Sequence, residues 1–156
     1  MSTFQIPLCV VPDLVFINPE ATHRTTLLTQ LATRAHTLGY VHDTYSDALL
    51  AREEQFPTGV PSATPAAIPH ADPSLVKKPG LGVALLPEPL TFEKMGAPGQ
   101  HVDVHLVLLL LVTEPDDQAA VLARVVGMLQ RDNLIEELRS RRDAHAVAQT
   151  IQLFLT

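Results

Sequence analysis

The sequence has few basic residues and a single cysteine. Eleven Lys and Arg stand against 17 Asp and Glu, giving a formal net charge of −6, and the longest basic run is RSRR at 139–142. Tracking a phosphate backbone needs a larger basic surface, so we expect no nucleic-acid partner. Cys9 has no second cysteine to pair with, which excludes an intrachain disulfide, and we expect it to be a small buried hydrophobe.

Long apolar segments and several well-known motifs are also missing. The most apolar run, 106–112, is far shorter than the roughly 18 residues of a membrane span. The start, MSTFQIPL, lacks the basic and apolar regions of a secretory signal, so we expect a soluble, cytoplasmic protein. There is no G-x-x-x-x-G-K-[ST], G-x-G-x-x-G or G-x-S-x-G motif, so ATP hydrolysis, dinucleotide chemistry and serine hydrolysis lack their usual framework. We expect no cofactor.

The length of 156 residues and a hydrophobic content of 46% predict one compact domain over residues 1–156. The pattern predicts a short or edge strand within residues 4–17, because the apolar run is broken by prolines. Spacings of three and four predict a helix over most of 22–39, ended by Gly39. A second helix starts at Asp43 or Thr44 and ends before Pro57.

The middle of the chain reads as strands and loops. Residues 57–65, with three prolines, predict an ordered loop, and 66–69 a brief strand. Segments 82–86 and 104–112 predict strands, the second covered on both faces, with a turn-rich hairpin or connection over 87–100.

Helices are expected to complete the chain. Acids and Pro115 begin the first, whose apolar positions run from Val121 to Leu129, and shorter helices follow at 133–139 and 143–155. The sum predicts an α/β fold, a small mixed β-sheet sandwiched by helices on both faces.

His70 is the first candidate for chemistry, because it follows the apolar Ala-Ile-Pro of residues 67–69. Imidazole has an unperturbed pKa of about 6.5, so a ring nitrogen is free as a nucleophile near neutral pH. Pro69 fixes the backbone before the ring. A purely structural histidine explains the residue equally well.

Arg52 is the second candidate, near the end of the helix before Pro57. It can cap helix carbonyls or pair with Asp47 or Glu53. Alternatively, its planar fork neutralises a phosphate brought to His70.

The stretch HVDVH offers a third possibility. His101, Asp103 and His105 would share one face of a strand that begins early enough, as three metal ligands. Solvated residues at a strand entry explain them as well, and we predict no metal site.

Three segments, LLAREEQFPTG, AAIPHA and DDQAAVLARVVGMLQRDNLIEEL, together resemble the enzyme IIA components of the bacterial phosphoenolpyruvate-dependent sugar phosphotransferase system, in the fructose and mannitol superfamily. The resemblance spans about residues 14–153. It implies a mannitol- or fructose-IIA-like fold, a phosphorylated histidine at His70 and a phosphate-stabilising arginine at Arg52. It also implies that Gln118 and Thr58 neighbour the phosphate.

The resemblance carries expectations about partners too. Phosphate would come from the phosphocarrier protein HPr and pass to a cysteine of enzyme IIB, with the membrane component IIC as an indirect partner. Mannitol-like members have a second active-site histidine where this chain has Gln118, and VHDTYSDALLAREEQFPTG looks most like galactitol-type proteins. We therefore expect galactitol or a related polyol. A regulatory IIA-like module, whose phosphorylation a partner reads, is the alternative.

Overall fold

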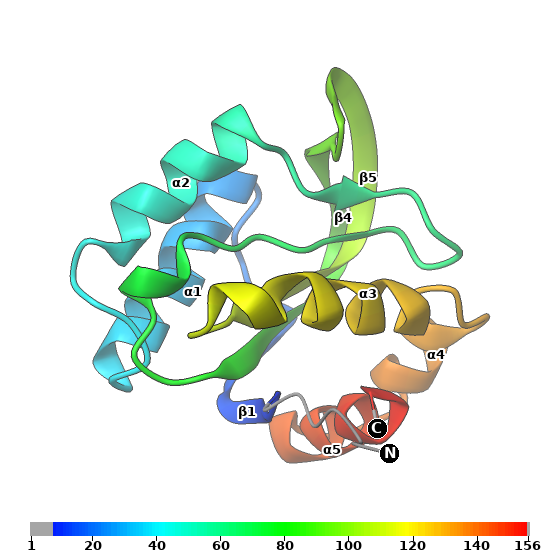
Figure 1. Ribbon diagram of the computed structural model, residues 1–156. Helices are drawn as coiled ribbons and strands as arrows, with labels where there is room; N and C mark the ends of the chain where they lie inside the picture. Colours follow the sequence, from blue (N-terminus) through cyan, green and yellow to red (C-terminus); the bar gives the residue numbers. More distant parts are fainter. Residues whose placement is uncertain (1–7, 156) are drawn as a thin grey trace, which may run out of the picture.

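A long antiparallel hairpin forms the centre of the molecule (Figure 1). This computed structural model describes residues 8–155. The hairpin consists of strands β4 (Gly80–Lys94) and β5 (Ala97–Leu111). Strand β1 (Val10–Ile17) pairs in parallel with β4, and β3 (Ala66–Ala67) pairs in parallel with β5. Both edges of the hairpin are thereby extended into a mixed sheet, as the sequence predicts.

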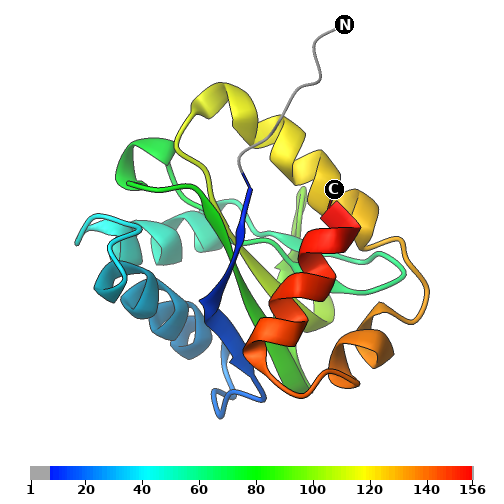
Figure 2. The same cartoon turned by 90° about the horizontal axis from the view of Figure 1, so that it is seen from below.

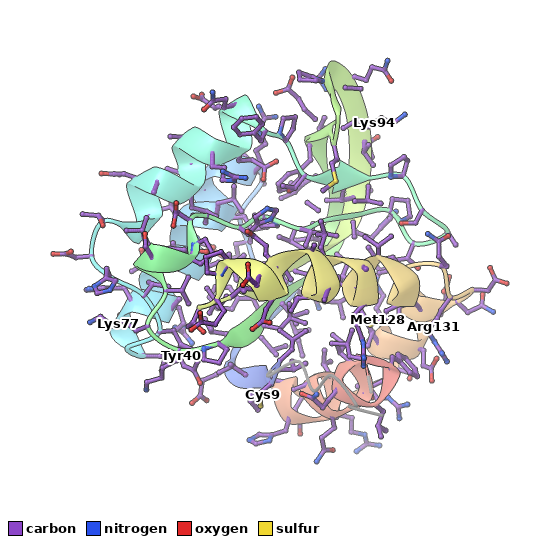
Figure 3. All side chains as sticks on the ribbon, in the orientation of Figure 1. Cys9, Tyr40, Lys77, Lys94, Met128 and Arg131 are labelled. Atoms are coloured by element: carbon purple, nitrogen blue, oxygen red, sulfur yellow. The ribbon has the colours of Figure 1, made fainter. Side chains whose placement is uncertain are left out.

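Strand β2 (Gly59–Val60) closes a circuit with the outer part of the hairpin. It pairs antiparallel with β3 and in parallel with the end of β4, where Gly59 lies opposite Lys94. The Met95 N–H also donates to the Gly59 carbonyl at 2.8 Å. Lys94 marks this end of the hairpin in Figure 3. The segment before His70 is therefore tied to both strands of the hairpin.

Alternation along the central strands divides the core into two layers. Val107, Leu109 and Leu111 of β5 pack into one apolar cluster, and Leu106, Leu108 and Leu110 into the other. Successive side chains of a strand point to opposite faces, so a continuous apolar run must be covered on both. This confirms the prediction that the segment is buried from two sides.

Helices supply the two covers, as Figure 2 shows. On one face lie α1 (Arg24–Thr37) and α2 (Tyr45–Gln55), and on the other α3 (Gln118–Met128) and α5 (Ala144–Leu155), with the short α4 (Leu134–Arg139) beside them. Two single turns of 3-10 helix, η1 (Pro73–Leu75) and η2 (Pro115–Asp117), complete the elements. The predicted α/β sandwich is confirmed.

Contacts between α5 and β1 join the two ends of the described chain. The Val10 N–H donates to Oε1 of Gln152 at 2.8 Å, and Nε2 of Gln152 donates to the Leu8 carbonyl at 3.1 Å. The side-chain amide of a helix residue thus continues the hydrogen bonding of a strand.

Some expectations differ from the structure. Residues 87–100, expected as a turn-rich hairpin or connection, do contain the hairpin, but its turn is limited to 95–96 and the rest is strand, because β4 and β5 continue past the core into solvent. The loop expected over 57–65 contains β2, and the strand expected over 66–69 is limited to β3. Cys9 is exposed rather than buried, just before β1 (Figure 3).

The end of the first helix and the extent of the first strand were also predicted. The predicted stop of the first helix is confirmed, since Gly39 has a φ of +82° after α1. Residues 4–7 of the strand predicted within 4–17 lie outside the described residues, and β1 accounts for 10–17. Within residues 8–155, none of the helices is long and apolar enough to cross a membrane.

Gly59 provides a test of this architecture. A Cβ at this position would lie 2.6 Å from the Glu93 carbonyl oxygen, so Gly59→Ala must push β2 away from β4. We expect a loss of roughly 2 kcal/mol in the free energy of unfolding, measured by urea denaturation.

Gly127→Ala is the matched control. Gly127 is exposed in α3 and its added Cβ would meet nothing within 4 Å, so this variant should gain about 1 kcal/mol from helix propensity. Equal stability of the two variants would show that the contact between β2 and β4 is not tight.

Candidate functional site

The segment from Ile68 to His70 follows β3 and is anchored on both sides. The Ile68 N–H lies 3.2 Å from both the carbonyl and the hydroxyl oxygen of Thr58. The Pro69 carbonyl accepts from the Leu110 N–H of β5 at 3.1 Å. Proline also fixes its own φ, so the backbone entering His70 has little freedom.

The ring of His70 is half-buried and its two nitrogens differ. Nδ1 lies 2.8 Å from the Ile68 carbonyl oxygen. Because a carbonyl can only accept, the neutral ring must carry its proton on Nδ1 to make this bond. Nε2 then holds a lone pair. Burial lowers the pKa of His70 below 6.5, against the Ile68 hydrogen bond that raises it, and the Arg52 charge lowers it further. The ring is therefore neutral at pH 7.

Arg52 lies in the last turn of α2 with its side chain exposed to solvent. Its guanidinium carbon lies 5.1 Å from the centroid of the Phe56 ring, a cation–π contact, and Phe56 is 54% exposed. Two hydrogen bonds from Ser74 lower the pKa of Asp72, and the Arg52 charge lowers it further. The Arg52 charge therefore acts on both His70 and Asp72.

Behind the histidine segment, Glu53 and Thr58 form a buried polar pair. The carboxylate accepts from the Thr58 N–H at 2.8 Å and from the Thr58 hydroxyl at 2.7 Å. Glu53 is 6% and Thr58 3% exposed. Burial raises the pKa of Glu53 from 4.5 to about 7, although the hydrogen bonds from Thr58 lower it. The hydroxyl of Thr58 is thus already engaged within the protein.

Sequence reasoning did not identify Glu53 as part of the site, but a signal was present. The buried positions of α2 are Tyr45, Leu49 and Glu53, spaced by four. A carboxylate that continues an apolar stripe must find hydrogen-bond partners inside the protein.

Gln118 is the first residue of α3 and is half-buried. Figures 1 and 2 both show the beginning of α3 beside the segment that leads through η1. The fold therefore brings the helix end with Gln118 to the side of the chain that carries His70. Thr58 is hydrogen-bonded to Ile68, two residues before His70.

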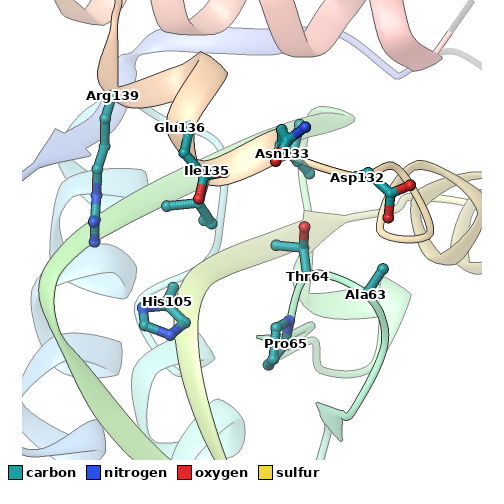
Figure 4. Close-up of a pocket in the computed structure, with 10 residues that line it drawn as sticks. Ala63, Thr64, Pro65, His105, Asp132, Asn133, Ile135, Glu136 and Arg139 are labelled. Atoms are coloured by element: carbon teal, nitrogen blue, oxygen red, sulfur yellow. The ribbon is translucent and has the colours of Figure 1, made fainter.

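A cavity of about 610 Å³ lies away from these residues, between the 63–65 loop, His105 of β5 and residues 132–139 (Figure 4). Its lining includes neither His70 nor Arg52. Nδ1 of His105 is buried there without a hydrogen-bond partner.

The possible metal site in HVDVH is not formed. His101 and Asp103 are exposed on the outer part of β5, and Asp103 accepts from the Thr91 hydroxyl at 2.9 Å. Among residues 8–155, no group of three or more His, Cys, Asp or Glu side chains could hold a metal ion. The strand does include all three residues, but alternation alone does not gather them.

Residues 10–153 match the family model described as "Phosphoenolpyruvate-dependent sugar phosphotransferase system, EIIA 2". The galactitol-specific EIIA component of Escherichia coli (strain K12) is 34% identical over 116 residues, 74% of this chain and 77% of that protein. A nitrogen regulatory protein of Bradyrhizobium diazoefficiens is 34% identical over 148 residues, 92% of each chain. The transcriptional regulator ManR of Bacillus subtilis is 36% identical over 114 residues, which are 73% of this chain and 16% of the regulator.

Solved structures share the fold. The crystal structure of IIA mannitol from Escherichia coli has a TM-score of 0.73 at 19% identity, covering 94% of this chain and 99% of its own. The same domain in complex with phosphorylated enzyme IIB mannitol has a TM-score of 0.72 at 19% identity, covering 94% and 97%.

The lowered pKa of His70 makes stability depend on pH in a defined direction. The unfolded chain takes up a proton near pH 6.5, whereas the folded protein resists it, so stability from the neutral ring is lost as pH falls through that value. We expect His70→Gln to lose less stability than the wild type between about pH 8 and about pH 5, measured by urea denaturation. Equal losses would show that the ring is not desolvated.

Proposed function

This chain belongs to the EIIA 2 family of the phosphoenolpyruvate-dependent sugar phosphotransferase system, and we propose on that basis that it carries a phosphoryl group on Nε2 of His70. The observation that carries the proposal is the hydrogen bond between Nδ1 and the Ile68 carbonyl. It leaves Nε2 as the free, unprotonated nitrogen of a half-buried ring.

The chemistry needs no general base at this ring. The Nε2 lone pair attacks phosphorus of the phosphorylated donor, the bond from phosphorus to the donor atom breaks, and the donor atom leaves with the electron pair. The ring becomes positively charged as the new N–P bond forms, and the Ile68 carbonyl stabilises this charge at Nδ1–H. Attack on the same phosphorus by a cysteine thiolate of enzyme IIB then returns His70 to its neutral state.

Arg52 would hold the phosphoryl oxygens during both steps. A guanidinium presents two parallel N–H groups to a phosphate, which orients it as well as neutralising it. Stacking on Phe56 limits the directions in which the guanidinium can turn. Gln118, at the beginning of α3, would add a neutral hydrogen bond to the phosphate.

For partners we propose HPr as the phosphate donor and an enzyme IIB as the acceptor, with a membrane IIC component receiving phosphate only indirectly. The solved complex of IIA mannitol with phosphorylated IIB mannitol supports a IIB partner for this fold. Similarity to the galactitol-specific EIIA component supports galactitol or a related polyol as the sugar. One domain over 1–156 acting in the cytoplasm fits this role.

Regulation is the second candidate function. Two of the relatives, the nitrogen regulatory protein and ManR, are named for regulation rather than transport. In that case the phosphorylation state of His70 would be read by a binding partner. The same nucleophile serves both roles, so the two differ only in what phosphorylated His70 meets next.

Phosphate labelling tests the carrier role. Incubated with phospho-HPr, the protein should take up one phosphate, labile in acid and stable in alkali, with a ³¹P–¹⁵N coupling at Nε2 of His70. His70→Ala should take up none, because the nucleophile is removed. Phosphate retained by that variant would contradict the assignment.

The same assay separates the supporting residues. Arg52→Lys should slow transfer to IIB by roughly tenfold, since the charge stays but the two-pronged contact is lost. Gln118→Ala should slow transfer less than Arg52→Ala, because glutamine contributes no charge. Wild-type rates in Arg52→Lys would return Arg52 to a structural role.

Partner preference tests the sugar. Phosphorylated protein should pass its phosphate to a galactitol-type IIB faster than to a mannitol- or fructose-type IIB, measured side by side under single-turnover conditions. Equal rates would contradict galactitol as the sugar, but the proposed role as a phosphoryl carrier would stand. Labelling without transfer to any of the three would favour regulation.

A further inference from the structure

Hydrogen bonds connect Glu53 to the ring of His70 through Thr58 and the backbone of Ile68. We propose that Glu53 and Thr58 are positioning residues that fix the tautomer and orientation of His70, so that Nε2 faces the phosphoryl donor. The expected effect on phosphoryl transfer rests on the proposed function. The tautomer of the His70 ring, however, can be measured without any phosphate.

The path begins with two bonds from a single residue to one carboxylate. Thr58 donates its N–H to Oε2 of Glu53 at 2.8 Å and its hydroxyl proton to Oε1 at 2.7 Å. A hydroxyl has one proton, and giving it to Glu53 leaves only lone pairs for other neighbours. The hydroxyl oxygen of Thr58 must therefore act as an acceptor toward Ile68.

The next step orients the peptide groups around Ile68. The Ile68 N–H is shared between the hydroxyl and the carbonyl oxygen of Thr58, both at 3.2 Å. The Ile68 side chain is fully buried, and the Pro69 carbonyl is held by Leu110. With both flanks fixed, the remaining Ile68 carbonyl points to Nδ1 of His70 at 2.8 Å. Loosening Thr58 would free this carbonyl and let the ring choose either tautomer.

Arg52 and the buried pair of Glu53 and Thr58 are linked because Arg52 and Glu53 are consecutive residues. Arg52 and Glu53 are neighbours in the last turn of α2, where the Phe56 N–H donates to the Arg52 carbonyl at 2.6 Å. Arg52 is exposed and Glu53 buried, so the same helix end presents a guanidinium to solvent and a carboxyl group to Thr58. Thr58 then closes the turn back onto Glu53.

Charged groups on two other elements act on the Glu53 carboxylate. Arg24 of α1 lowers its pKa and Glu93 of β4 raises it, and these two side chains form an ion pair at 4.0 Å. Burial has the largest effect and opposes ionisation. A neutral amide is therefore an acceptable replacement in this environment, so Glu53→Gln should fold.

The first measurement is the tautomer of His70, read from ¹⁵N chemical shifts of the imidazole ring above its pKa. The wild type should show mainly the Nδ1–H form. Glu53→Gln cannot accept from both donors of Thr58, and Thr58→Val keeps the shape but loses the hydroxyl, so both should show a larger share of the Nε2–H form. Thr58→Ser, which restores the hydroxyl, and Glu54→Gln, at the exposed neighbour of Glu53, are the matched controls and should resemble the wild type.

The second measurement is the rate of phosphorylation by phospho-HPr. Glu53→Gln and Thr58→Val should be slower by about tenfold, as expected for a misoriented nucleophile, while both controls stay within about twofold of the wild type. Amide spectra verify that each variant is folded. If Thr58→Val fails to fold, Glu53→Gln decides the question alone.

An unchanged tautomer in folded Glu53→Gln would overturn the proposal. A slow Thr58→Val with an unchanged tautomer would also overturn it, and would show instead that the Thr58 hydroxyl acts on the phosphate directly. A wild type that takes no phosphate at His70 would overturn the proposed function, whereas the tautomer measurement would still decide whether Glu53 and Thr58 hold the ring.

Discussion

The hydrogen bonds between Thr58 and Ile68 are the connection on which the site depends. They continue the short pairing of β2 with β3, and they hold the N–H of Ile68, the residue whose carbonyl meets Nδ1 of His70. Two strands of two residues each could not hold such a geometry alone. They do so here because β3 is paired with β5, whose residues 106–111 are all buried, and because β2 lies against β4. The sheet thereby holds the segment from Ile68 to His70 rigid, although that segment has little regular structure of its own.

The parts of the site come from both helical layers. Arg52 and Glu53 belong to α2 on one face of the sheet, and Gln118 begins α3 on the other. The histidine segment leaves the sheet between the two layers, where a ring can be half-buried and still reach a partner. Burial keeps the ring neutral, while the guanidinium remains in solvent and costs little to keep charged. The candidate site therefore combines a neutral, half-buried ring with a charged guanidinium in solvent.

Local patterns predicted the helices, the buried strand 104–112 and the candidates His70 and Arg52, because each depends on residues near in sequence. The strands that were not predicted depend on pairing with segments far away in the sequence. Within 87–100 only Leu90 and Phe92 are buried, and prolines and glycines flank them, so these strands are held mainly by pairing with each other. β2 exists only because Ala66 and Ala67 on one side and Lys94 on the other lie against it. Glu53 was expected only as a possible partner of Arg52, because a carboxylate spaced by four from Tyr45 and Leu49 is revealed as buried only by the packing of α2.

The amide of Gln152 has a consequence for how the chain is made. A strand at the edge of a sheet offers unpaired N–H and C=O groups to any passing chain, and β1 is such a strand. Gln152 occupies these groups at its beginning, bonding to Val10 and Leu8 in the manner of a neighbouring strand. Among the described elements β1 comes first in the chain and α5 last, so this strand edge stays uncovered during synthesis until α5 has been made. A chain that stops before α5 would therefore keep an exposed strand edge, which favours aggregation.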